Sequence, residues 1–196
     1  MASQQQQGSE ALVSLGGPLF RKPGTTHEDF IVAWHRHACI VVPWFLEFGI
    51  VEYIQIHLPE PADKATTDAA AAAAATSQDD GGAAERLLRR ADGVALVRCR
   101  VVPSVEGGAR PFGDGFTHPY LEKVVTVDER RFLHEEFGAG AIRREPPSFE
   151  IPDLSADAWR GLAVRIGGVE HVKIMGAREL VEDAWWDEWE KMEVGT

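Results

Sequence analysis

Two histidines, His37 and His57, have the side chains best suited in this sequence to move a proton near neutral pH. His37 lies in a stretch where Phe30, Trp34, His37 and Val41 recur at helical spacing and therefore share one apolar stripe. An imidazole in such a stripe is more often a packed core residue than a catalyst. The segment that follows it strengthens the catalytic interpretation.

Residues 49–58 alternate as a strand does. One side of this strand is apolar, and the other carries Tyr53, Gln55 and His57. If the polar side faces the helical stripe, a pocket forms that contains two imidazoles, a phenol and an amide, lined by Phe30 and Trp34. The pattern predicts a proton-transfer site without a metal.

The signals around residue 26 predict where the helix that carries His37 begins. Pro23 and Gly24 interrupt the preceding segment, and Thr25 or Thr26 can accept an amide hydrogen bond as the N-cap. Glu28 and Asp29 then place negative charge in the first turn, which the helix dipole favours. We therefore expect this helix to begin near Thr26.

Composition excludes several classes of protein. The chain has 196 residues and 44% apolar residues, and no apolar run approaches the roughly 20 residues that cross a bilayer, so no membrane span is expected. A formal charge of −11 repels phosphate backbones, which argues against nucleic acid binding. Two cysteines without metal-site spacing, and an N-terminus without signal-peptide character, predict a reduced, cytoplasmic setting.

The organisation expected is one domain with appendages. Residues 1–9 are polar and predicted to be disordered, and residues 10–177 form the domain. Within it, residues 59–84 contain seven consecutive alanines and are interpreted as a low-complexity insertion. Residues 178–196 are predicted to form an acidic helix whose stripe of Trp185, Trp189 and Met192 packs on its own subunit or across a dimer.

The remaining elements complete an α+β fold. A first strand at residues 11–20, interrupted by glycines and Pro18, is expected at an edge or bulge. After a turn at Gly93 comes a third strand at residues 94–102. Residues 119–137 follow as two helical pieces with Asp128 as a cap, then an irregular excursion at residues 138–160, and a last strand within residues 162–175.

This order of strands and helices is ferredoxin-like, with an antiparallel sheet and both helices on one face. The opposite face, rich in Ile54, Ile56 and Leu58, is then left bare. A second copy related by two-fold symmetry would cover that face, which predicts a homodimer.

The sequence lacks the motifs that are typical of several kinds of cofactor chemistry. The sequence has no Gly-rich phosphate loop, no nucleophile elbow and no metal-ligand set that stands out, so neither a cofactor nor a metal is expected. His35 and His37 are two positions apart on a helix and point in nearly opposite directions, so they cannot chelate one metal ion. His35 is expected to face solvent. Of the kinds of chemistry considered, histidine acid-base catalysis in an apolar chamber is the one left.

Five blocks in order resemble the EthD-domain group of the dimeric α+β barrel superfamily. They are Arg-Lys-Pro-Gly-Thr-Thr-His-Glu-Asp-Phe (21–30), Trp-His-Arg-His-Ala (34–38), Val-Glu-Tyr-Ile-Gln-Ile-His (51–57), Asp-Gly-Val-Ala (92–95), and His-Pro-Tyr (118–120) followed by Asp-Glu-Arg-Arg-Phe (128–132). The resemblance covers about residues 11–137 and implies a dimeric α+β barrel.

The resemblance also implies an activity. Fungal members of this group look like cofactor-independent lyases that tailor aromatic polyketides in secondary metabolism, most notably by decarboxylation. By this resemblance Tyr53 or a histidine polarises a ketone and His37 or His57 protonates the carbon, while the substrate contacts Phe30, Trp34, Val41, Gln55 and Tyr120. The alternatives are a dehydratase or cyclase of the same pathway type, a cofactor-free monooxygenase, and a non-catalytic ligand-binding protein.

Overall fold

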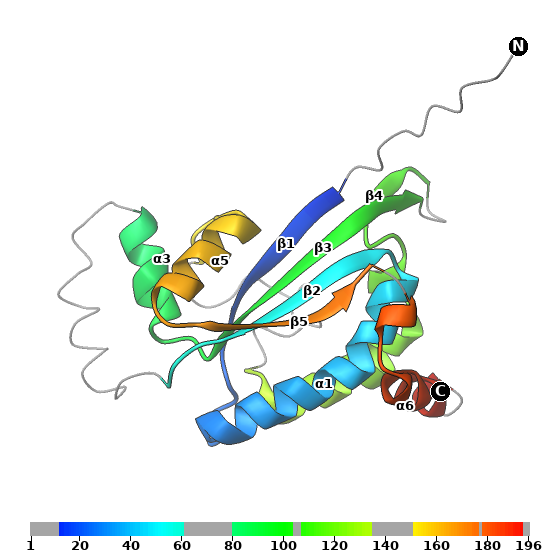
Figure 1. Ribbon diagram of the computed structural model, residues 1–196, viewed down its shortest axis with the longest axis horizontal. Coiled ribbons are helices and arrows are strands. Elements are labelled where there is room, and N and C mark those ends of the chain that lie inside the picture. The colour runs from blue at the N-terminus through cyan, green and yellow to red at the C-terminus, as the bar shows by residue number, and fades with distance from the viewer. Residues whose placement is uncertain (1–11, 61–79, 104–106, 135–150, 177, 194–196) are drawn as a thin grey trace, which may run out of the picture.

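The computed structural model describes residues 12–60, 80–103, 107–134, 151–176 and 178–193 (Figure 1). The predicted tail at residues 1–9 and most of the alanine-rich insertion, residues 61–79, lie outside the described residues. The described part of the chain contains no helix with the length and hydropathy needed to span a membrane.

A mixed α+β fold is confirmed, and its centre is an antiparallel sheet. Four strands lie in the order β1-β3-β2-β5, and short β4 pairs with the end of β3. Their bounds are β1 Leu12–Leu19, β2 Ile50–His57, β3 Gly93–Pro103, β4 Ala109–Pro111 and β5 Val169–Met175. Strand β1 is continuous through Pro18 and lies at the edge, where a residue without an amide hydrogen is tolerated.

The position of the last strand corrects the ferredoxin-like prediction. In a ferredoxin-like sheet the last strand pairs with the first, whereas here β5 pairs antiparallel with β2, at the opposite edge from β1. The first three strands do form the expected split arrangement, with β3 between β1 and β2. The local hydrophobic pattern predicts where the strands lie in the sequence, but it does not predict the edge of the sheet at which β5 pairs.

Helix α1, His27–Glu47, spans one face of the sheet (Figure 1). Its predicted start is confirmed, because the Thr26 side chain accepts a hydrogen bond from the Asp29 amide at 3.0 Å. The predicted apolar stripe is also confirmed, since its four members are all buried: Phe30, Trp34, His37 and Val41. Helix α1 therefore carries His37 into the interior.

The C-terminal segment packs against α1 within the same chain. It consists of the short η4, Arg178–Leu180, and helix α6, Asp183–Glu193. Trp186 and Trp189 are its most buried aromatic residues, while Trp185 and Met192 are only partly buried. The predicted packing role is confirmed, with Trp186 taking the place expected for Trp185.

Helices also cover the other face of the sheet, so the prediction of helices on one face only is wrong. Helix α3, Asp80–Leu88, and helix α5, Ala156–Arg165, pack on that face over the end of β2 (Figure 1). They bury Ile54, Ile56 and Leu58, the residues expected to be bare. Helix α5 begins inside the predicted excursion, capped by Ser155, and residues 138–150 lie outside the described residues.

The predicted pair of helical pieces is in fact one continuous helical segment. After η1, Gly115–Thr117, comes the π-helical η2, Leu121–Val125, which runs directly into α4, Thr126–Phe132. Asp128 makes no cap, because it lies inside the first turn of α4 and its carboxylate turns toward α1. Gly93 likewise makes no tight turn: it opens β3, and a Cβ there would lie 2.3 Å from the Trp34 ring.

Candidate functional site

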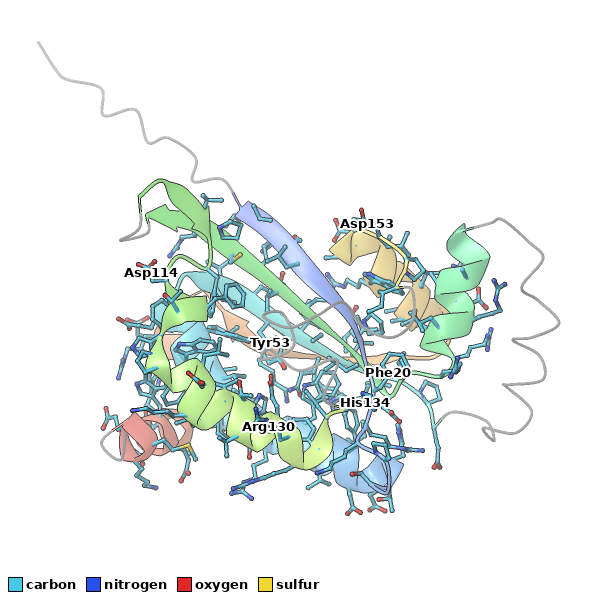
Figure 2. All side chains as sticks on the ribbon, turned by 180° about the vertical axis from the view of Figure 1, so that it is seen from behind. Phe20, Tyr53, Asp114, Arg130, His134 and Asp153 are labelled. Carbon is cyan, nitrogen blue, oxygen red and sulfur yellow. The ribbon has the colours of Figure 1, made fainter. Side chains whose placement is uncertain are left out.

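A cavity of about 600 Å³ lies between the sheet and the layer formed by α1 and α4. This volume falls in the range that holds drug-sized ligands. Figure 2 shows Tyr53 of β2 between the sheet and the helices, with Asp153 beside the start of α5. We call this cavity the chamber. Among the described residues, its wall is apolar apart from four titratable side chains: His37, Tyr53, Glu129 and Asp153.

The edge strand explains how the chamber reaches both layers of helices. Gly16 and Gly17 of β1 offer no side chain to either face, so the wall there is backbone. A Cβ at Gly17 would meet no atom within 4 Å, whereas one at Gly16 would lie 2.3 Å from the Ala95 carbonyl oxygen. The chamber therefore extends past β1 to Leu154 and Trp159 beside the outer helices.

His37 joins the chamber to a pair of carboxylates on α4. Its Nδ1 atom lies 2.7 Å from Oδ2 of Asp128, and its Nε2 atom lies 3.8 Å from Oε1 of Glu129. An ionised carboxylate can only accept a hydrogen bond, so Nδ1 of His37 carries a proton and donates it to Asp128. Glu129 lines the chamber and Asp128 does not, so the Nε2 edge of the imidazole is the one turned toward the chamber.

The electrostatics of the pair favour an ionised Asp128. Burial alone would raise the pKa of this carboxyl, but the hydrogen bond and charge of His37, helped by Arg131, outweigh burial. The pKa of Asp128 is therefore held below its usual value. A carboxylate fixed at Nδ1 orients the imidazole and stabilises its protonated form.

Tyr53 is a hydrogen-bond donor to the chamber. Its hydroxyl oxygen accepts hydrogen bonds from Nε1 of Trp34 and Nε2 of Gln55, both at 3.1 Å. None of the described residues accepts a hydrogen bond from this hydroxyl. Burial raises the pKa of Tyr53 to about 12, so the phenol keeps its proton at neutral pH. An acceptor oxygen on a ligand would satisfy it.

His57 is not on the wall of the chamber, so the prediction of two imidazoles in one pocket is wrong. It lies on the same sheet face as Tyr53, but behind Trp34 as seen from the chamber. The His57 ring is 5.0 Å from the Trp34 ring. Burial, together with the charges of His171 and Lys173, lowers the pKa of His57 to about 4.

A hydrogen-bond chain still connects His57 to the chamber. Nε2 of Gln55 donates to the Trp34 carbonyl oxygen at 2.9 Å, which leaves its Oε1 facing Nε2 of His57 at a long 3.5 Å. The same amide nitrogen contacts Tyr53. His57 and Gln55 therefore support Tyr53 from behind rather than touch the contents of the chamber.

The other predicted contacts divide into two groups. Trp34 and Val41 line the chamber as predicted. Phe30, Gln55 and Tyr120 do not, because each is used in packing or in an internal hydrogen bond. Tyr120 packs against Trp189 with ring centroids 4.3 Å apart and the rings tilted by 50°, and its hydroxyl donates to the Ile40 carbonyl oxygen at 3.4 Å.

Sequence reasoning missed two groups of site residues. Asp128 and Glu129 were visible as an acidic pair, but Asp128 was interpreted as a cap and no chemical role was assigned to either residue. The wall formed by Trp44, Leu154 and Trp159 gave no local signal, since its members come from elements far apart in the chain. The glycine pair in an apolar strand was a usable signal, because it leaves space on both faces of an edge strand.

Metal chemistry has no ready site in the described parts of the chain. No group of three or more His, Cys, Asp or Glu side chains there is placed to hold a metal ion. What the chamber does offer is one histidine that is hydrogen-bonded to a carboxylate, a neutral phenol donor and apolar walls. Comparison of the chain with protein-family models, with curated proteins and with solved structures found no match to any of them.

Proposed function

We propose that this protein is a cofactor-independent lyase that removes carbon dioxide from an aromatic polyketide or a similar β-keto acid. The observation that carries the proposal is the position of His37, whose Nδ1 atom is held by Asp128 while its Nε2 edge faces a large apolar chamber. A histidine held by a carboxylate in this way can act as both proton donor and proton acceptor. The proposal agrees with the EthD-type tailoring enzymes that the sequence motifs resemble.

The first step of the proposed reaction uses Tyr53. The ketone oxygen of the substrate accepts the hydrogen bond that the Tyr53 hydroxyl has free on the chamber side. When the bond between the α-carbon and the carboxylate breaks, its electron pair forms an enolate and carbon dioxide leaves. The neutral phenol then stabilises the charge that develops on the enolate oxygen.

The second step uses His37. Its imidazolium form, stabilised by Asp128, donates the Nε2 proton to the α-carbon of the enolate and becomes neutral. Solvent returns this proton before the next turnover. The Glu129 carboxylate lies 3.8 Å from Nε2, beside the proton that is donated.

The apolar wall contributes to the rate in this proposal. The aromatic and aliphatic side chains of the chamber solvate a carboxylate poorly and solvate carbon dioxide well. Partly exposed chamber side chains such as Phe45 and Phe116 also offer apolar contact to a planar aromatic substrate. The preferred substrate is therefore a polycyclic aromatic acid with a ketone next to the carboxylated carbon.

The experiment that tests the proposal is incubation of the purified protein with an anthrone-type carboxylic acid, followed by mass spectrometry. Loss of carbon dioxide supports the lyase. Loss of water would instead indicate a dehydratase or cyclase. Oxygen uptake would indicate a cofactor-free monooxygenase, and bound but unchanged ligand would indicate a binding protein.

We also propose that the protein is a homodimer, as the dimeric barrel of the resembled family implies. Helices α3 and α5 cover one end of the outer sheet face, and Leu12 and Val172 remain 49% and 46% exposed elsewhere on it. Light scattering on the purified protein would give twice the 21.6 kDa chain mass for a dimer. The mass of a single chain would contradict this part of the proposal.

A further inference from the structure

Four basic side chains gather outside the chamber, where edge strand β5 passes α1. Nζ of Lys173 lies 2.7 Å from Nδ1 of His35, and the rings of His57 and His171 lie 4.4 Å apart. We call His35, His57, His171 and Lys173 the basic cluster. They come from three elements, α1, β2 and β5, so the fold and not local sequence brings them together.

A β-bulge aims Lys173 at α1. Tyr53 pairs with Ile174 and Ile54 pairs with Val172, so Lys173 is an extra residue without a partner in the register of β5. Such an insertion re-aims a side chain and is common at sheet edges and near functional sites. Here it lets Ile174 enter the core while Lys173 reaches His35 on the same side of the sheet.

The basic cluster is unusual because no described carboxylate pairs with any of its members. Other basic groups on the helices that pack against the sheet do have such partners: Arg160 contacts Glu170 at 2.7 Å, and His27 contacts Asp92 at 3.2 Å. In a chain with 31 acidic and 20 basic residues, basic groups gathered without acidic partners are not expected by chance. Charging more than one of them creates a mutual repulsion that a bound anion would relieve.

The hydrogen-bond directions leave donors free. Nδ1 of His35 accepts from the Lys173 ammonium, so the proton of a neutral His35 lies on Nε2. The ammonium retains two further N–H groups, and the His171 ring adds another nitrogen donor. All four residues keep some exposure to solvent, so a small ligand could reach them.

We propose that the basic cluster binds a doubly charged oxyanion, either inorganic phosphate or the phosphate of a monoester. A tetrahedral oxyanion presents enough acceptor oxygens for an ammonium and several imidazole N–H groups at once, whereas a carboxylate presents two. This site is separate from the chamber and does not depend on the function proposed for it.

Neighbouring charges set the pH dependence of the proposed site. From the elements packed around it, Glu182 acts on His35 and Lys173, Cys39 lies close to Lys173, and His27 acts on His57. Glu182 is not within ion-pair distance of the cluster, so it attracts the cations without neutralising them. Protonation of the imidazoles therefore favours anion binding as the pH falls, until the phosphate dianion itself gains a proton at about pH 6.

The experiment is titration of the full chain with inorganic phosphate, and separately with phenyl phosphate, followed by NMR of the histidine ring protons. The proposal predicts saturable shifts for His35, His57 and His171. It also predicts affinity weaker by about tenfold to a hundredfold in Lys173→Gln, the range of a lost charge-assisted hydrogen bond. Lys191→Gln, which removes a lysine paired with Glu188 on α6, is the matched control and keeps full affinity.

Two further variants distinguish loss of the anion site from misfolding of the protein. Lys173→Arg keeps the charge and retains binding, and His171→Gln weakens it, each with an unchanged circular dichroism spectrum. Tighter binding of phenyl phosphate than of inorganic phosphate would identify a monoester as the ligand, and the reverse order would identify free phosphate. Absence of saturable shifts with either probe, or equal affinity of Lys173→Gln and the unchanged chain, would overturn the proposal.

Discussion

His37 and Asp128, 91 positions apart in the chain, are joined by a hydrogen bond of 2.7 Å between Nδ1 and Oδ2. The bond links the two helices that lie on the same side of the sheet, α1 and α4. It fixes which ring nitrogen carries the proton and leaves the other edge of the imidazole toward the chamber. The proposed chemistry depends on this pairing.

Asp128→Asn removes the charge from the pair but keeps the size of the side chain. We expect kcat to fall by roughly a hundredfold, because the imidazolium loses its stabilising carboxylate. The control is Asp157→Asn on the exposed first turn of α5. Turnover of Asp128→Asn within a few-fold of that of the unchanged protein would show that Asp128 does not act through His37.

Gly17→Leu should fill the chamber without disturbing the sheet. A Cβ at Gly17 meets no atom within 4 Å, and its register partner Ala95 also lines the chamber. We expect ligand affinity to fall by at least about tenfold while the melting temperature changes little. Gly161→Leu is the matched control, because a Cβ there also meets no atom, but on α5 away from the chamber. Full affinity in Gly17→Leu would place the ligand elsewhere.

Tyr53→Phe removes the proposed donor to the ketone. We expect kcat to fall by about a hundredfold, as for loss of an oxyanion donor, and stability to fall by about 1–3 kcal/mol. The loss of stability arises because Trp34 and Gln55 lose their shared acceptor. Tyr120→Phe removes a buried hydroxyl outside the chamber, so it should cost stability without loss of kcat. Equal kcat in both variants would remove Tyr53 from the mechanism.

His57 should make stability depend on pH. Its folded pKa of about 4 lies below the value near 6.5 of an unfolded histidine. Between these values the unfolded chain binds more protons than the folded chain, so the folded state loses stability as the pH falls through this window. We expect the drop in melting temperature from pH 7 to about 4.5 to be smaller in His57→Gln. An equal drop in both proteins would contradict the lowered pKa.

Periodicity in the sequence was enough to predict the two elements that build the centre of the site. The helical stripe of α1 and the alternation of β2 correctly placed His37 and Tyr53 on facing surfaces. The N-cap at Thr26 was also correct, because capping is a local interaction between residues three positions apart. These features depend on short-range geometry, which a single sequence records.

Features that depend on distant segments were not predictable in the same way. His57 shares a sheet face with Tyr53, but the Trp34 indole, which fits over Gly93, occupies the space between His57 and the chamber. Asp128 has the local character of a cap, and only the continuous path from η2 into α4 turns it toward α1. The covering of the outer face by α3 and α5 is likewise a tertiary outcome.

The most direct test of the central claim is the turnover number of His37→Ala on an aromatic β-keto acid that the unchanged protein decarboxylates. The account predicts that carbon dioxide release falls by on the order of a hundredfold or more, because the proton donor in the chamber is gone. His134→Ala, a histidine that is not on the chamber wall, should keep the rate of the unchanged protein. Turnover of His37→Ala within a few-fold of that rate would contradict the account.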